Sequence, residues 1–278
     1  MPIDMEEAMS VLGRWRNEYG SILDIRSQAP NGSLSGIYTS DTGASGTYMM
    51  NGWCPFDATG TQNAPISVNI FWKPTDSTVE DPSWNWVSNM TGALFYDAPT
   101  GVPRLQLLHG MVASTLFPAV QVDRPGVYTE TLGFDLLPDP LARTRAPTLR
   151  RGGRALKAAT YTLTNLDPGA RVSSIRLITE NDGSAIGSVT LPSELVSGLG
   201  FVDPTPPANL QSVAASCLSL RGSPHALGFS GFIDVNANVA TLDLFESSEV
   251  TWPNKYTATT VSQERFSVSV SRTTYPKP

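Results

Sequence analysis

The fold can be inferred from one stretch near the N-terminus, LGRWRNEYGSILDI, which runs from Leu12 to Ile25. An aromatic side chain, an amide and a hydroxyl, those of Trp15, Asn17 and Ser21, fall on alternate positions of a predicted strand and the turn that follows it. Because a strand with period two buries one face, these side chains point to the same side. Two polar groups beside a buried tryptophan are unexpected in a core strand and need an explanation.

The composition of the whole chain predicts an all-β protein. Of 278 residues, 40% are hydrophobic and only 16% are charged, and the 23 glycines and 22 prolines suit short strands joined by turns. Apolar and polar residues alternate in ISVNIFW (66–72), PRLQLLHGMV (103–112) and RFSVSVS (265–271). Asn-Gly and Asp-Gly pairs between such runs favour tight hairpins, so consecutive strands are expected to be antiparallel neighbours.

Charge and cysteine content exclude several classes of protein. The net charge of -6 and the pI near 4.9 argue against a nucleic-acid partner, because phosphate binding needs a clustered basic surface. The first ten residues, MPIDMEEAMS, are acidic and lack an apolar core, so we expect no signal peptide, no membrane partner and a cytoplasmic location. Cys54 and Cys217 are too few for a disulfide framework and lack the spacing of a metal site.

The sequence divides into two halves of similar length. PDPLARTRAPTLRRGGRALK, with its prolines, adjacent glycines and basic residues, predicts a linker over 139–157 between domains at 1–138 and 158–278. Corresponding motifs recur in the same order in both halves, for example NGSLSGIYTS from Asn31 and DGSAIGSVTLPS from Asp182. We therefore interpret the chain as an internal duplication of one β unit.

The first half resembles the avidin and streptavidin family. The series GRWRNEYGS, GSLSGIYTSDTG, ISVNIFWKP, SWNW and TLGFD is similar to the ordered motifs of that family and extends over nearly all of residues 12–137. The resemblance implies two eight-stranded antiparallel up-and-down β-barrels in tandem, of which the first holds biotin at its open end. Barrels of eight strands independently leave room for one small ligand.

The resemblance also gives the polar groups on the buried face a role. It implies that Asn17, Ser21 and Tyr38 donate hydrogen bonds to the ureido oxygen of the ligand, and that Ser40 and Asp135 accept from its two N–H groups. A buried urea group without partners would cost about 1 to 3 kcal/mol for each unpaired group. The alternative is that Asn17 and Ser21 satisfy only a strand end and a turn.

The aromatic wall implied by the resemblance is less complete. Trp72 matches the tryptophan that ends one strand, and Trp84 or Trp86 matches the next, with the choice between them open. His109 stands where the family has another tryptophan, which predicts weaker binding or a different ligand. His109 as a catalytic base remains an alternative to a structural role.

Two tyrosines are candidates for the residue that caps the ligand from a neighbouring subunit in the family. Tyr128 is the counterpart in the first copy and Tyr256 in the second, where Glu264 replaces the expected aspartate. The second copy has no recognisable Trp and Asn pair before Ser173, and Val189 or a neighbour replaces the pocket tyrosine. We therefore expect it to support or cap the first copy.

Two functions from different classes follow from these observations. The first is binding of biotin or a related cyclic urea in the N-terminal barrel, with biotin as the only small molecule implied and no separate cofactor. The second is a duplicated barrel repurposed as a secondary-metabolism enzyme of the cyclase or isomerase type. No nucleophile with a placed base, phosphate loop or metal cluster is recognisable. A barrel–barrel interface within the chain is expected, and a homo-oligomer is compatible with it.

Overall fold

The computed structural model describes residues 10–42, 44–56, 62–75, 81–96, 100–138, 159–180, 182–204, 209–251 and 258–272. The predicted linker at 139–157 lies outside these ranges. Strand β8 ends at Leu136 before it and β9 begins at Ala159 after it.

The first eight strands form a closed antiparallel barrel in which each strand pairs with its neighbours in the sequence. The pairing of β1 with β8 completes the circle, and all eight strands run up and down in turn. The bounds are β1 Gly13–Asn17, β2 Ile22–Gln28, β3 Ser33–Ser40, β4 Gly46–Trp53, β5 Gln62–Pro74, β6 Val87–Tyr96, β7 Pro103–Ala113 and β8 Gly126–Leu136, with short 3-10 helices η1 Pro82–Asn85 and η2 Pro118–Val120.

The second half forms another closed barrel with the same connectivity, in the order β10-β11-β12-β13-β14-β15-β17-β9. The prediction of an all-β chain with two eight-stranded antiparallel barrels in tandem is confirmed. Among the described residues no helix is long and apolar enough to cross a membrane. The bounds are β9 Ala159–Asn165, β10 Ser174–Thr179, β11 Ser184–Leu191, β12 Glu194–Val202, β13 Leu210–Ser219, β14 His225–Asp234, β15 Val239–Ser248, β16 Val250–Thr251 and β17 Ala258–Arg272.

Matching turns show the duplication at the level of single residues. Gly32 and Gly183 both adopt positive φ, 87° and 89°, after Asn31 and Asp182. In each turn the preceding side-chain oxygen accepts hydrogen bonds from the backbone N–H and the hydroxyl of the serine that follows the glycine. Only glycine adopts this conformation without strain, so the sequence fixes both hairpins locally.

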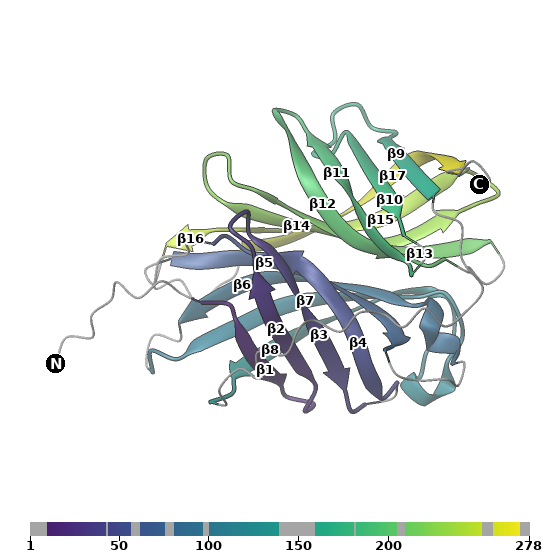
Figure 1. The fold of residues 1–278 in the computed structure, drawn as a ribbon. Coiled ribbons are helices and arrows are strands. Elements are labelled where there is room, and N and C mark those ends of the chain that lie inside the picture. The colour runs from purple at the N-terminus through teal and green to yellow at the C-terminus, as the bar shows by residue number, and fades with distance from the viewer. Residues whose placement is uncertain are drawn as a thin grey trace, which may run out of the picture.

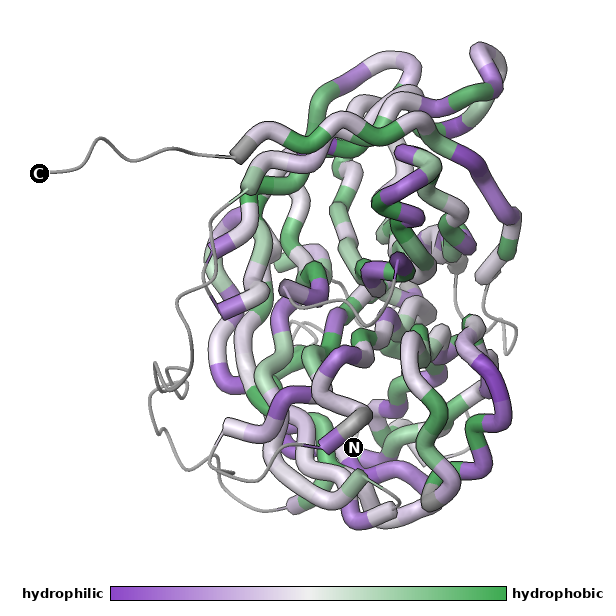
Figure 2. The backbone as a smooth tube through the Cα atoms, turned by 90° about the vertical axis from the view of Figure 1, so that its right-hand side faces the viewer, coloured by the Kyte–Doolittle hydropathy of each residue, from purple (hydrophilic) through white to green (hydrophobic). Residues whose placement is uncertain are grey.

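Strand pairing makes the two barrels comparable position by position. Asn17 pairs with Phe134 of β8, and Asn165 pairs with Phe266 of β17. Following the register round each barrel from this pair returns to the same correspondence, except at two register shifts of the first barrel, between Ile25 and Ser27 and between Tyr48 and Met49. Both cores consist of inward-facing apolar side chains, and Figure 2 shows the alternation of apolar and polar segments along the tube.

The two barrels pack wall against wall, with β5 and β6 of the first against β13 and β14 of the second (Figure 1). Phe71 stacks on Phe201 across this interface, with ring centroids 5.6 Å apart. The Asn69 amide donates across it to the carbonyl oxygen of Leu199 at 3.2 Å and to the hydroxyl of Ser216 at 2.7 Å. The interface is therefore apolar and specifically hydrogen bonded.

Strand β16 adds a second link that the sequence did not predict. Val250 and Thr251 pair antiparallel with Asn63 and Gln62 at the start of β5, so the second half adds a short strand to the sheet of the first barrel.

Candidate functional site

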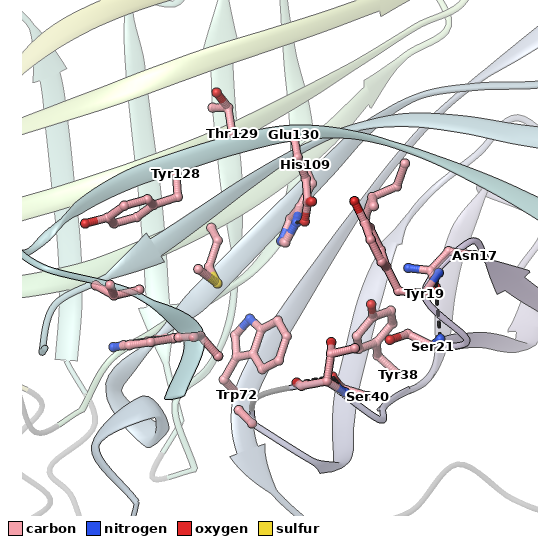
Figure 3. A pocket seen from close by; sticks show the side chains of 17 residues that line it. Asn17, Tyr19, Ser21, Tyr38, Ser40, Trp72, His109, Tyr128, Thr129 and Glu130 are labelled. Atoms are coloured by element: carbon pink, nitrogen blue, oxygen red, sulfur yellow. Dashed lines mark hydrogen bonds and ion pairs between the residues drawn. The ribbon is translucent and has the colours of Figure 1, made fainter. Parts of the chain in front are cut away.

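The N-terminal barrel contains a pocket of about 290 Å³ at the end where β1, β3 and β5 finish. This volume suits one small molecule. The wall is polar on one side and aromatic on the other (Figure 3). The lining residues are Asn17, Tyr19, Ser21, Tyr38, Ser40, Thr42, Ala44, Trp72, Trp86, His109, Met111, Val120, Val122, Tyr128, Thr129, Glu130 and Leu132.

Three polar side chains from β1, the β1–β2 turn and β3 meet on one wall. The Oδ1 atom of Asn17 accepts from the backbone N–H groups of Tyr19 and Ser21, at 3.1 and 2.9 Å, which fixes the turn and orients the amide. The side chains of Ser21 and Asn17 line the pocket beside Tyr38, and both act on the pKa of its hydroxyl. The two hypotheses for Asn17 and Ser21, turn stabilisation and pocket wall, therefore hold together.

Burial raises the pKa of Tyr38 to about 12, despite the opposing hydrogen bonds from Ser21 and Asn17. The phenol is neutral at physiological pH and keeps its proton. It can donate that proton to a ligand carbonyl.

Ser40 also lies in the pocket, at the end of β3. Its hydroxyl donates to the carbonyl oxygen of Thr42 at 3.1 Å and its oxygen accepts from the Thr42 backbone N–H at 3.4 Å, so a ligand N–H would use the second lone pair of that oxygen.

The aromatic side is formed by Trp72 and Trp86. The ring centroid of Trp72 lies 5.9 Å from that of Tyr38 in an edge contact, and Trp86 packs edge-on against Phe117 at 5.6 Å. Trp84 does not line this pocket: its ring lies under the Nζ atom of Lys73, 5.8 Å from the centroid. The structure thus distinguishes the two candidates on η1 and its end, and places Trp86 in the pocket.

A chain of hydrogen bonds runs from the aromatic wall to a carboxylate. The indole Nε1 of Trp72 donates to the Ser88 hydroxyl at 2.7 Å, Ser88 Oγ lies 2.9 Å from His109 Nε2, and His109 Nδ1 lies 3.0 Å from Glu130 Oε1. Figure 3 shows His109 and Glu130 reaching in on one side of the pocket and Ser21 and Tyr38 on another. We call these four residues, Trp72, Ser88, His109 and Glu130, the relay.

The proton positions in the relay follow from the chemistry of its members. A carboxylate only accepts, so Nδ1 of His109 donates to Glu130, and when Nε2 carries no proton it accepts from the Ser88 hydroxyl. An indole only donates, so the Ser88 hydroxyl accepts a hydrogen bond from Trp72 and directs its own proton toward His109 Nε2. The hydrogen bond from His109 lowers the pKa of Glu130, which keeps the carboxylate charged.

Asp135 lies elsewhere, contrary to the role implied for it. It is exposed on the outer face of β8 and pairs with Arg104, whose Nε lies 2.7 Å from its Oδ1. The inward positions of β8 are Glu130, Leu132 and Phe134, because large apolar side chains at alternate positions set which face is buried. A displacement by one residue turns a side chain to the opposite face, so Asp135 points away from the pocket.

The cover of the pocket comes from the same barrel. Val120 and Val122, in the segment between β7 and β8, line the pocket together with Tyr128. Tyr128 therefore contributes to its own barrel. Tyr256 lies outside the described residues, and the nearby strand β16 pairs with the start of β5, at the opposite end of that strand from Trp72.

The second barrel retains one polar pair. Its Asn165, equivalent to Asn17, donates from Nδ2 to Glu264 Oε2 at 2.6 Å. Glu264 is equivalent to Leu132 and not to Asp135, so the expected match between Glu264 and Asp135 is wrong by three residues. Asn165 is the amide that sequence comparison missed, because a leucine stands at the tryptophan position two residues before it.

The relay has the order of a Ser-His-Glu triad, but its geometry argues against nucleophilic chemistry. Ser88 is fully buried, does not line the pocket, and receives the indole proton of Trp72. Both nitrogens of His109 are occupied by hydrogen bonds. Within the described ranges no group of three or more His, Cys, Asp or Glu residues could hold a metal ion.

Glu130, Ser88 and Tyr19 are the main residues that sequence reasoning missed. Glu130 lies on the same face of β8 as Leu132 and Phe134, because the three residues alternate along the strand. The alternation within YTETLGF, from Tyr128, therefore predicts that Glu130 points inward. Ser88 and Tyr19 gave no comparable signal, because their roles arise from contacts with other strands or from a turn.

Comparison with known proteins relates this geometry to one family. The avidin family model matches residues 5–90, which include β1 to β5 and the first strand residues of β6. The crystal structure of Xenavidin is similar at 19% sequence identity, with 47% of this chain and all of that chain covered and a TM-score of 0.37. None of the curated proteins matches. The family model thus matches the first five strands of the first barrel and the start of the sixth, and the second half of the chain forms another closed eight-stranded barrel with the same connectivity.

Proposed function

We propose that the N-terminal barrel of this avidin-like tandem protein binds one small ligand, biotin or a related cyclic urea, and that the C-terminal barrel supports it structurally. One observation carries the proposal: Asn17, Ser21 and Tyr38 meet on the polar wall of a 290 Å³ pocket whose opposite wall is aromatic. A cyclic urea needs donors for its carbonyl and acceptors for its N–H groups, and it presents an apolar ring to the aromatic side.

The second barrel is assigned a supporting role because two of its equivalent positions are apolar. Val189 stands at the position of Tyr38, and Leu191 at that of Ser40. A urea at this place would find neither the phenol nor the serine hydroxyl.

Calorimetric titration of the full chain with biotin tests the proposal. We expect one site per chain, and Tyr38→Phe should weaken binding about tenfold by removing one donor to a buried carbonyl. Absence of heat with a folded protein would exclude biotin as the ligand, and two sites would contradict the supporting role of the second barrel.

The enzyme alternative is less well supported, because the buried Ser88 and the fully hydrogen-bonded His109 leave no free nucleophile or base in the relay. Mass spectrometry of ligand recovered after prolonged incubation separates the two functions. An unchanged mass is expected for binding, and a changed mass would favour the enzyme.

A further inference from the structure

The pocket contains one carboxylate that the family resemblance does not account for, that of Glu130. It comes from β8, two residues before Leu132 and four before Phe134, which is the partner of Asn17 on β1. With Asp135 on the outer face, Glu130 is the acidic residue among the pocket-lining side chains.

The carboxylate has one oxygen available for a ligand. Its Oε1 accepts from His109 Nδ1 at 3.0 Å, and the side chain is about half exposed, at 48%, toward the pocket. The His109 ring is itself held at Nε2 by Ser88, and Ser88 by the indole of Trp72. A charged acceptor is thus held in a fixed place by a fully satisfied set of partners.

The position of Glu130 relative to the donor wall defines a ligand. Glu130 lines the same pocket as Asn17, Ser21 and Tyr38 and reaches into it from a different side (Figure 3). A molecule that contacts both would present a carbonyl to the donor wall and an N–H group to Glu130.

We propose that Glu130 is the ligand-recognising carboxylate of this pocket, and that it selects small rings carrying a carbonyl beside an N–H group, such as cyclic ureas and lactams. This inference rests on the proposed function in that it assumes a small ligand in the N-terminal barrel. His109 and Ser88 are positioning residues, because they act on the ligand through Glu130.

Two probes test the inference directly. 2-Imidazolidinone and 1,3-dimethyl-2-imidazolidinone share ring and carbonyl, but only the first has N–H groups. Dissociation constants measured by NMR titration of the full chain should favour 2-imidazolidinone at least tenfold, because an ionised acceptor strengthens the hydrogen bond that the methylated probe lacks.

The substitution Glu130→Gln should abolish that preference. His109 would still donate to the amide oxygen, which leaves the amide NH₂ facing the N–H group of the ligand, donor against donor. The preference should fall from at least tenfold to less than threefold. The steric effect of the probe's methyl groups is the same in wild type and in the variant. A change in the affinity ratio therefore reports the N–H contact.

Matched variants separate the effect of the Glu130 contact from effects of net charge and of protein stability. Asp135→Asn removes the same charge from the same strand on the outer face and should leave the ratio unchanged. Ser88→Ala removes a hydrogen bond that holds His109 and should lower the ratio partly, in addition to any equal change in the affinity for both probes. A merely structural role of Ser88 would weaken both probes equally.

The outcomes distinguish this inference from the proposed function. If 2-imidazolidinone binds, the affinity ratio of the two probes depends on Glu130 and biotin gives no heat, the inference is supported and biotin is excluded as the ligand. Biotin binding with a ratio unaffected by Glu130→Gln would overturn the inference alone. Failure of both biotin and 2-imidazolidinone to bind the folded protein would overturn both.

Discussion

The two barrels share a frame but differ in what they enclose. Where the first barrel has Ser88 and His109 of the relay, the second has Leu227 and Leu244, which are buried in an apolar core. The same eight strands close in both cases. The comparison teaches that the barrel closes without Ser88 and His109 of the first copy, which agrees with the proposal that the polar set of the first barrel serves a ligand and not the fold.

The interface shows a second difference between the copies. Asn89 and Gly228 occupy equivalent positions, as do Gly110 and Phe245, and each pair meets across the interface. A Cβ on Gly228 would lie 2.0 Å from Asn89 Oδ1, and one on Gly110 would lie 2.7 Å from the Phe245 ring. A large residue in one copy therefore fills the space left by glycine in the other, and two identical copies would not fit this way.

The largest predicted effect comes from making one of these pairs identical. Gly228→Asn would place a side chain against Asn89, whose amide is held by Ser67 and Asn69 and cannot move aside freely. Overpacking of this kind costs up to about 3 kcal/mol. With a protease site introduced in 139–157, the cleaved wild-type halves should elute together in gel filtration, and the cleaved Gly228→Asn halves should separate.

Gly133→Asn is the control, because a Cβ at Gly133 meets no atom within 4 Å. Its cleaved halves should elute together like those of the wild type. Separation of the wild-type halves, or persistence of the Gly228→Asn complex, would contradict the complementary fit.

The frame could be predicted from the sequence because its signals are local. Period-two alternation gives strands, and the Asn31-Gly32 and Asp182-Gly183 turns give the hairpins, so consecutive antiparallel pairing follows. Strand β16 could not be predicted, because Val250 and Thr251 pair with a strand nearly 190 residues earlier, as their partners Asn63 and Gln62 show. Nothing local distinguishes such a pairing.

The site was predictable only where one motif contains its geometry. Asn17, Ser21, Tyr38 and Ser40 come from β1, the β1–β2 turn and β3, which follow one another closely in the sequence, and all four line the pocket, where the family resemblance implied them. Asp135 was misplaced because a motif match was preferred to the alternation of Leu132 and Phe134, which governs orientation. Glu130 was missed for the same reason.

A smaller effect is expected from the same substitution at the two equivalent amides. Asn17→Asp keeps the oxygen that holds the turn and loses the NH₂ donor, so affinity for biotin should fall at least tenfold, or about 1.4 kcal/mol. Asn165→Asp should leave biotin affinity unchanged, because its partner is Glu264 in the second barrel.

Calorimetry with biotin measures the affinities, and urea unfolding measures stability. Asn165→Asp places two carboxylates together, so it should lower the free energy of unfolding at pH 7 more than at pH 4. Equal loss of affinity in both variants would mean that the second barrel takes part in binding.

The smallest effect concerns Glu130 of the first barrel and Glu264 of the second, whose pKa values move in opposite directions. The hydrogen bond from His109 lowers the pKa of Glu130, whereas burial raises that of Glu264. A group whose pKa is lowered on folding stabilises the protein above its unfolded pKa, and this contribution is lost as the pH falls through the folded value. A carboxyl group whose pKa is raised gives its contribution at low pH and loses it as the pH rises through the folded value.

The variants Glu130→Gln and Glu264→Gln should therefore change the pH dependence of unfolding with opposite signs. Relative to wild type, Glu130→Gln should become less stable as the pH rises from about 3 to 5, and Glu264→Gln more stable as it rises above about 4.3. Because both side chains are only partly buried, each change should stay below about 1 kcal/mol. Urea unfolding at several pH values measures it, and shifts of the same sign in both variants would show that the carboxylates occupy similar environments, against the difference between the barrels described above.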